Sequence, residues 1–266
     1  MKIYCCQLDI AWENKGENFK RVRTLLDQRR LAPGSLVVLP EMFATGFTMN
    51  AAAIAEPING PTDGFLRGLA REKGIFVLGG LARPASRGRI HNEAVCFAPS
   101  GRRMAGYEKL HLFSPGGESR HYAPGAAVTL FRWGKLKVAI SICYDLRFPE
   151  IYRMAVQRGA SALVVIANWP GKRHSHWTAL LHARAIENQA YAIGVNRCGH
   201  DPHLGYHGGS LVVNPQGQTV AEAGRGETVI SAKLDLIAMN RLRADFAVLR
   251  DARTRFVLKK PNRQRQ

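Results

Sequence analysis

Three short, almost continuously apolar runs constrain the fold of this chain more than any other feature of its sequence. They are VVLP at 37–40, VAISI at 138–142 and LVVIAN at 163–168. A strand without alternating polar and apolar residues is covered on both faces, and helices supply that cover in layered α/β proteins. Amphipathic segments separate these runs, beginning with a helix predicted over 18–30. The sequence therefore predicts an α/β fold with buried strands.

The rest of the chain continues this alternation. Residues 110–124 form the longest stretch without a period, and such loops often carry function. No low-complexity linker divides the chain, so we expect one domain over 1–266. The other predicted elements are a strand over 2–10, a helix over 61–74, a strand over 75–82, a hairpin of 91–99 and 102–109, helices over 146–159 and 176–189, a strand over 191–196, hairpins over 208–224 and 226–235, and a short helix over 234–243.

The charge of the chain raises a different class of function. Lysine and arginine number 38 against 20 aspartate and glutamate, a net charge of +18, so nucleic-acid binding has to be considered. The densest basic stretch is a C-terminal tail from about residue 250, where seven basic residues stand against Asp251 alone. Such tails are usually solvated, and the chain lacks the repeated aromatic platforms of single-strand binders. We expect no specific nucleic-acid partner.

The location of the protein is predicted from what its sequence lacks. No stretch of about 18 uncharged apolar residues occurs. Asp9 and Glu13 interrupt the N-terminal segment where a signal peptide needs its apolar run. The five cysteines are scattered and contain no C-x-x-C pair, which argues against a disulfide framework. We expect a cytoplasmic protein without a membrane partner.

Three chemically active residues follow strands of the predicted sheets. Glu41 closes the strand LVVLP, Lys109 follows the strand RRMAGYE, and Cys143 stands between the strand KVAISI and a helix. Ligands bind beyond the carboxyl ends of strands in open α/β sheets. A thiol is mostly protonated at neutral pH, so a carboxylate that takes its proton makes attack practical, and an ammonium can hold the oxyanion that forms. Together these residues predict nucleophilic catalysis by Cys143.

The segments around these residues resemble a known family. VVLPEMFATGF, YEKLHLF and ISICYDLRFPE are similar to the three signature regions of the nitrilase, or carbon-nitrogen hydrolase, superfamily with its Glu-Lys-Cys triad. The resemblance implies that Glu41 is the general base and Cys143 the nucleophile. It implies further that Lys109 and the backbone N–H of Tyr144 hold the oxyanion, and that Glu118 supports the lysine.

The resemblance continues to about residue 235 and sets the expected architecture. It implies a four-layer α-β-β-α sandwich of two mixed sheets, a homodimer or higher homo-oligomer, and no metal or organic cofactor. The motifs PEMFATGFTMN, NWP, HW and GVNRCG are most similar to the omega-amidase branch. That branch hydrolyses the terminal amide of 2-oxoglutaramate and related 2-oxo acid amides, through a cysteine thioester. Another small-molecule amidase or nitrilase, or a basic nucleic-acid-associated protein with a vestigial triad, is the alternative.

Candidate substrate contacts follow the strand LVVIAN. Trp169 and Arg173 lie at the same predicted sheet edge as Cys143, where an aromatic wall and a guanidinium can receive a small carboxylate-bearing amide. The alternatives are a capping aromatic and a solvent-facing charge. Phe43, two residues after Glu41, either lines the pocket or packs below it.

The histidines offer a rival chemistry, that of a metal-assisted hydrolase. One group precedes or lies in a predicted helix and the other lies in a glycine-rich loop, and neither contains an H-E-x-x-H arrangement. We therefore expect no catalytic metal. The two groups are His174, His176 and His182, and His200, His203 and His207.

Overall fold

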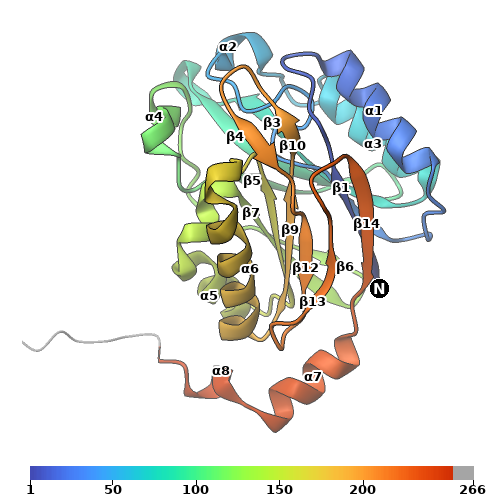
Figure 1. Cartoon of the computed structure of the whole chain (residues 1–266), viewed down its shortest axis with the longest axis vertical. Coiled ribbons are helices and arrows are strands. Elements are labelled where there is room, and N and C mark those ends of the chain that lie inside the picture. Colours follow the sequence, from blue (N-terminus) through green and yellow to red (C-terminus); the bar gives the residue numbers. More distant parts are fainter. Residues whose placement is uncertain (254–266) are drawn as a thin grey trace, which may run out of the picture.

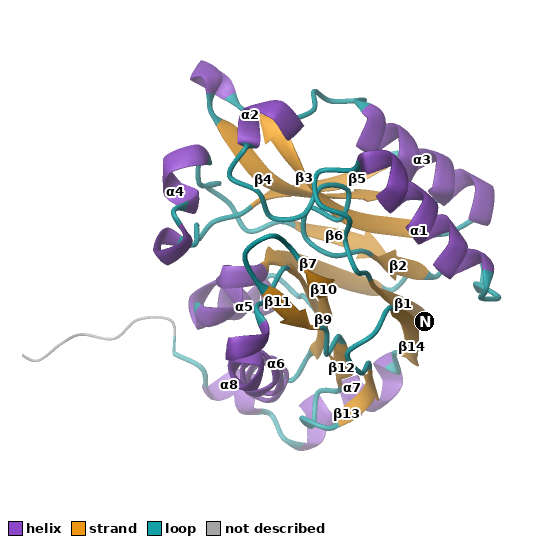
Figure 2. Ribbon diagram, turned by 45° about the horizontal axis from the view of Figure 1, so that its top comes forward, coloured by secondary structure: helices purple, strands orange, loops and turns teal. Residues whose placement is uncertain are grey.

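The computed structural model describes residues 1–253. The expected basic tail from about residue 250 lies, apart from its first four residues, outside the described residues. Helix, sheet, sheet and helix form successive layers (Figure 1, Figure 2). The predicted α-β-β-α sandwich of two mixed sheets is therefore confirmed.

Each of the two sheets has six strands. The strands of the first sheet are β1 (Lys2–Gln7), β2 (Leu36–Val38), β3 (Phe76–Pro84), β4 (Ile90–Phe97), β5 (Arg103–Glu108) and β14 (Thr228–Lys233). Those of the second are β6 (Leu130–Trp133), β7 (Leu136–Ile142), β8 (Ala162–Ala167), β9 (Tyr191–Asn196), β12 (Leu211–Val213) and β13 (Thr219–Glu222). The orders are β14-β1-β2-β3-β4-β5 and β13-β12-β9-β8-β7-β6. The triplets β1-β2-β3 and β7-β8-β9 are parallel, and the flanking pairs are antiparallel.

Helices cover the outer faces of both sheets (Figure 2). They are α1 (Lys15–Asp27) and α3 (Pro61–Lys73) on the first sheet, and α5 (Pro149–Gln157) and α6 (His174–Asn188) on the second. None of the helices in the described part of the chain combines the length and the apolar character that crossing a membrane needs. Within residues 1–253, four further helices lie in connections or after the last strand: α2 (Ala51–Ile54), α4 (Glu118–His121), α7 (Leu236–Asp245) and α8 (Val248–Asp251).

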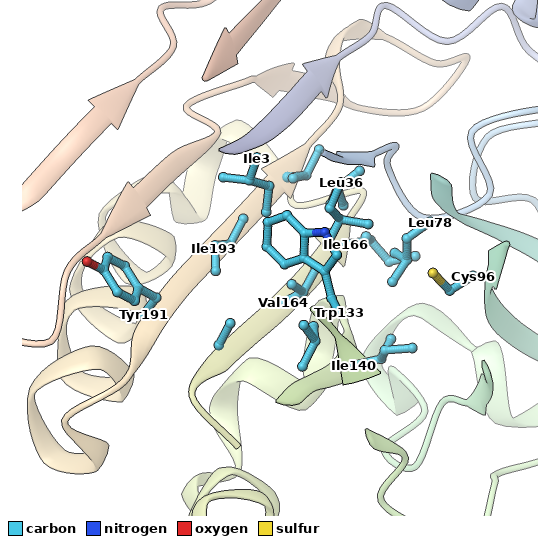
Figure 3. Packing of buried hydrophobic residues seen from close by; sticks show 14 of the residues in the cluster. Ile3, Leu36, Leu78, Cys96, Trp133, Ile140, Val164, Ile166, Tyr191 and Ile193 are labelled. Carbon is cyan, nitrogen blue, oxygen red and sulfur yellow. The ribbon is translucent and has the colours of Figure 1, made fainter. Parts of the chain in front are cut away.

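The apolar runs are continuous because both faces of their strands are buried. On β8, Val164 and Ile166 belong to the core between the sheets, whereas Leu163 and Val165 pack in the cluster under α5 and α6. Figure 3 shows the inter-sheet core, in which the Trp133 ring lies among side chains of both sheets. Successive residues of one strand thus bury opposite faces, as the period of a strand requires.

Side-chain caps explain two shifts of helix boundaries. The helix predicted over 18–30 is α1, which starts earlier because the Asn14 side chain accepts a hydrogen bond from the Glu17 N–H at 3.0 Å. The helix predicted over 234–243 is α7, whose first turn is capped by the Asp235 carboxylate. Sequence periodicity locates the body of a helix well and its ends poorly.

One strand prediction is corrected, and three strands lie in segments for which the sequence predicts none. The segment 226–235 forms no hairpin of its own, because β14 crosses to the first sheet and pairs antiparallel with β1 along its whole length. The strand β6, which pairs antiparallel with β7, is only four residues long and lies in a segment for which the sequence predicts no element. A small hairpin of β10 (Cys198–His200) and β11 (Gly205–His207) forms in the segment predicted as a glycine-rich loop.

Candidate active site

Glu41 lies just after β2 and is fully buried. Its backbone passes so close to β3 that a Cβ at Gly80 would lie 2.6 Å from the Met42 nitrogen and 2.8 Å from the Glu41 Cα. Met42 has a φ of 42°, in the left-handed region that side-chain-bearing residues seldom adopt. Gly80 therefore allows a strained turn that carries Glu41 into the interior, and such strain is common at functional sites.

The Glu41 carboxylate contacts only hydrogen-bond donors. Its Oε1 accepts hydrogen bonds from Lys109 Nζ at 3.0 Å and from Asn92 Nδ2 at 2.7 Å. Its Oε2 accepts one from the backbone N–H of Asn168 at 2.8 Å. This arrangement suits a negatively charged carboxylate and fixes its orientation.

Lys109, directly after β5, is enclosed by two carboxylates. Its Nζ donates to Glu41 and also to the two oxygens of Glu118, at 2.9 and 3.1 Å, and the side chain is fully buried. Burial alone would lower the pKa of Lys109, but the charges of Glu118 and Glu41 outweigh it and raise that pKa above its usual value. The side chain is therefore an ammonium at neutral pH.

Glu118 is the first residue of α4, in the long loop that the sequence marks as functional. Besides Lys109, it accepts hydrogen bonds from Asn92 Nδ2 at 3.0 Å and from the Phe113 N–H at 2.6 Å. Asn92 on β4 thus joins the two carboxylates on either side of the lysine. The structure places Glu118 against Lys109, and the support of the lysine by Glu118 in catalysis stays a prediction.

Cys143 opens a 3-10 turn, Cys143–Arg147, between β7 and α5. Its φ of 46° is again left-handed. It is partly exposed, whereas the other four cysteines are buried. Desolvation by the surrounding protein, then the charge of Glu41, raise the pKa of Cys143 well above its usual value, against the opposing effect of Lys109. The sulfur is therefore a thiol at rest and needs a base before it can attack.

A buried aspartate connects the segments of Lys109 and Cys143. Asp145, in the turn that Cys143 opens, accepts hydrogen bonds from the Tyr107 hydroxyl at 2.7 Å and from the His111 N–H at 2.9 Å. Tyr107 and His111 stand two residues before and two after Lys109. Sequence reasoning missed this role, although the residue stands in the motif ISICYDLRFPE, because its partners lie on β5 and in the loop after it, more than 30 residues away in the chain.

Lys109 and Cys143 line one cavity. Five of its twelve lining residues are aromatic, and none is acidic. The hairpin of β10 and β11 contributes two of the lining side chains, which the sequence did not single out. The other lining residues are Phe47, Phe113, Tyr144, Arg147, Asn168, Trp169, Pro170, Arg173, Leu204 and Tyr206.

Two guanidinium groups border this cavity. Arg173 lies over the Phe113 ring at 5.2 Å, and Arg147, which the sequence did not single out, lies over the Trp169 ring at 4.8 Å. The Trp169 indole donates to the Arg173 carbonyl at 2.7 Å, which fixes the wall against the turn. Within residues 1–253, neither guanidinium lies within ion-pair distance of a carboxylate. The cavity thus offers positive charge to a ligand.

Of the remaining expected site residues, Tyr144 borders the cavity and Phe43 does not. Tyr144 follows Cys143 directly, and its ring packs against Phe113 at 5.1 Å. Phe43 is corrected: it is fully buried in the outer cluster beneath α1 and α3, where its ring packs against Phe19 and Phe65. The turn at Met42 directs residues 41 and 43 to different layers, which residue spacing cannot predict.

The histidines do not gather into a metal site in the described residues. The rings of His174 and His207 lie 6.1 Å apart, and His182 bonds the Gly217 carbonyl at 2.8 Å. No group of three or more His, Cys, Asp or Glu residues in positions 1–253 is placed to hold a metal ion.

The α-β-β-α sandwich and a match to a family model together define the class of this protein as a hydrolase of carbon–nitrogen bonds. The chain belongs to the carbon-nitrogen hydrolase family, whose model matches residues 2–244.

Two relatives and one crystal structure show which proteins this chain is similar to. The 2-oxoglutaramate amidase of Bacillus subtilis (strain 168) is 31% identical over 252 residues, which cover 94% of this chain and 97% of that protein. The omega-amidase YafV of Escherichia coli (strain K12) is 35% identical over 254 residues, with coverages of 95% and 96%. A crystal structure of a CN-hydrolase superfamily protein from Xanthomonas campestris, with an arsenic adduct in its active site, superposes with a TM-score of 0.90 at 32% identity, covering 97% of this chain and 99% of that one.

Proposed function

We propose that residues 1–266 form a single carbon-nitrogen hydrolase domain that hydrolyses the terminal amide of a small 2-oxo acid amide of the 2-oxoglutaramate type. The products are the carboxylic acid and ammonia, and the intermediate is a thioester on Cys143. One observation carries this proposal: Lys109 and Cys143 line the same cavity, which has no acidic lining residue. The Lys109 ammonium also donates a hydrogen bond to Glu41, which is not itself one of the lining residues.

Acylation uses the three groups in turn. Glu41 takes the Sγ proton, and the sulfur of Cys143 attacks the amide carbon, so that a C–S bond forms and the carbonyl oxygen becomes negative. The Lys109 ammonium and the Tyr144 backbone N–H hold that oxygen. Glu41 then gives its proton to the amide nitrogen, the C–N bond breaks, and ammonia leaves.

Deacylation repeats the sequence with water. Glu41 removes a proton from a water molecule, and the oxygen of that water attacks the thioester carbon. The C–S bond breaks, Glu41 returns the proton to the sulfur of Cys143, and the acid is released. The raised pKa of Cys143 supports this scheme, because the scheme needs a protonated thiol both before acylation and after the acid is released.

Two observations support this substrate class: the positive charge at the cavity and the names of similar proteins. Arg147 and Arg173 supply positive charge at a cavity without acidic lining residues, which suits an amide that carries a carboxylate. Relatives named 2-oxoglutaramate amidase and omega-amidase support the same substrate. Another small-molecule amide, or a nitrile, is the alternative that a substrate panel separates.

Ammonia release from a panel of 2-oxoglutaramate, a neutral amide of equal length, glutamine and a small nitrile tests the proposal. We expect the 2-oxo acid amide to have the highest kcat/KM, and ammonia release to vanish in Cys143→Ala. Turnover that survives in Cys143→Ala would remove the cysteine from the mechanism, and a preference for the neutral amide or the nitrile would remove the substrate assignment.

Arg173→Ala tests the recognition of the carboxylate. We expect KM for the anionic amide to rise by about tenfold or more, with the neutral amide spared, because the substitution removes one charge-assisted hydrogen bond to the substrate. Arg153→Ala on α5 is the matched control, since that side chain bonds the Glu187 carbonyl at 2.6 Å and is not one of the cavity lining residues. An equal loss for both substrates in Arg173→Ala would reject carboxylate recognition by this residue.

A further inference from the structure

The proposed base and nucleophile belong to different sheets. Glu41 follows β2 of the first sheet, and Cys143 follows β7 of the second. The distance between them therefore depends on how the two sheets are held together at this edge. A misplacement of about 1 Å between reacting groups can cost about a hundredfold in rate. A residue that contacts both groups is thus a candidate for setting their alignment.

Asn168 contacts both groups. Its Nδ2 donates to the backbone carbonyl of Glu41 at 2.7 Å and to Oε2 of the same residue at 3.3 Å. Its backbone N–H donates to that Oε2 at 2.8 Å. Its own carbonyl oxygen accepts from the Cys143 sulfur at 3.9 Å. The side chain is 4% exposed, so these contacts are shielded from water.

The second sheet holds Asn168 in place. The residue directly follows β8, which pairs in parallel with β7 up to the pair Ile142–Ile166. The next residue, Trp169, donates its N–H to Asn196 Oδ1 at 2.7 Å, and Asn196 Nδ2 returns a hydrogen bond to the Trp169 carbonyl at 3.1 Å. Asn168 is therefore anchored independently of Glu41, which it can then orient.

We infer that Asn168 is a positioning residue of this enzyme: its amide and N–H aim Oε2 of Glu41 at Cys143 and fix the spacing of the two sheets at the site. The inference rests on the proposed function, because it takes Glu41 as the base. Oε1 accepts from Lys109 and Asn92, whereas both donors to Oε2 belong to Asn168, whose carbonyl the Cys143 sulfur contacts. We therefore take Oε2, on the side of Cys143, as the oxygen that accepts the thiol proton.

The test uses Asn168→Ala, which removes the side-chain donor, and Asn168→Asp, which keeps the size and replaces the donor by an oxygen. Losing a donor to the carboxylate makes its ionised form less stable. We expect the acid limb of kcat/KM to move up by about one pH unit in Asn168→Ala and further in Asn168→Asp. We expect kcat to fall by about ten- to a hundredfold, and KM to change by less than about threefold, because the amide faces Glu41.

Several ionisable groups surround Glu41 and enter the interpretation of that profile. They are Lys109 after β5, Glu118 on α4, the Cys143 thiol after β7 and the Tyr122 phenol after α4. None of them accepts a hydrogen bond from the Asn168 side chain, so the substitution changes the donors of Glu41 alone.

Asn188→Ala is the matched control. Asn188 on α6 is also fully buried, and its Nδ2 also makes two hydrogen bonds, to the Arg184 carbonyl at 3.0 Å and to Glu187 Oε1 at 3.3 Å. It lies outside the site, so we expect its loss to lower stability without moving the pH profile. An acid limb that stays at the wild-type pH in both Asn168 variants would overturn the inference. A change in KM alone would also overturn it, because it would make Asn168 a substrate contact.

Alkylation separates this inference from the proposed function. The rate at which iodoethane, an alkylating agent without an amide group, labels Cys143 is followed by mass spectrometry against pH, with Cys143→Ala as background. It reports on the base and the thiol without any amide substrate. A shifted labelling profile in Asn168→Ala supports the positioning role even if every amide in the panel is left intact. An unshifted profile contradicts that role even if the amidase activity is found.

Discussion

At the scale of single residues, Lys109 is both a chemical group and a structural one. Lys109→Met would leave Glu41 and Glu118 buried side by side without their shared cation, and we expect a loss of about 3–5 kcal/mol at neutral pH. Two negative charges would then repel each other in a buried site, so the loss should become smaller as pH falls and carboxylates take up protons, and larger as pH rises. Urea denaturation at pH 5 and pH 8 measures this. The double variant Lys109→Met, Glu118→Gln should recover part of the loss, and a pH-independent loss would contradict the account.

The backbone strain at Cys143 predicts which of two substitutions leaves the folded protein more stable. With a φ of 46°, any side chain at this position has a cost that glycine avoids. We expect Cys143→Gly to be more stable than Cys143→Ala by about 1 kcal/mol, although both lose ammonia release. Thermal unfolding of the two variants makes the comparison. A less stable glycine variant would mean that the turn is not strained in solution.

The same residues show how far a sequence can specify a site. Glu41, Lys109 and Cys143 could be selected because each is a reactive type that directly follows a strand, which is local information. Asn92 and Asn168 could not be selected, because an asparagine becomes significant only through partners from other segments of the chain. Cross-sheet hydrogen bonds leave no periodic signal in the sequence.

At the scale of elements, the hairpin of β10 and β11 forms one wall of the cavity through Leu204 and Tyr206. Asp201 holds it: one carboxylate oxygen accepts from the N–H groups of His203 and Leu204, both at 2.7 Å, and the other from the Tyr206 hydroxyl. Such a side-chain turn is set by short-range contacts, but a segment rich in glycine and histidine has no apolar alternation that would predict strands. This wall of the cavity could therefore not be predicted from a pattern of apolar residues, whereas the strand β8 could.

Asp201→Ala tests whether this wall shapes the site. We expect KM to rise by about three- to tenfold with kcat less affected, because the hairpin loses three hydrogen bonds and none of the three reacting residues is touched. Steady-state kinetics on the best amide measures it, with Asp245→Ala at the exposed end of α7 as the control. A variant with kcat reduced and KM unchanged would show that the hairpin acts on the chemistry and not on binding.

At the scale of the whole molecule, two properties are independent of each other: the sandwich that brings two sheet edges together, and a net charge of +18. The first depends on buried apolar strands, and the second on side chains spread over the surface and concentrated toward the C-terminus. Charge of this kind produces nonspecific attraction to polyanions, which weakens steeply with salt. It says nothing about the fold, so the alternative function as a nucleic-acid-associated protein has to be tested by binding.

A variant that ends at residue 253 isolates this contribution, because it removes five basic residues and no acidic one. We expect the full chain to bind duplex DNA at about 50 mM salt, to lose that binding by about 200 mM, and to show no preference among sequences. The shortened variant should give a smaller slope of log affinity against log salt, by up to about 0.9 for each phosphate that it no longer neutralises, with kcat/KM for the amide unchanged. Salt-resistant or sequence-selective binding by the full chain would favour a nucleic-acid function instead. A fall in amidase activity on removal of residues 254–266 would show that the charged tail and the cavity are coupled.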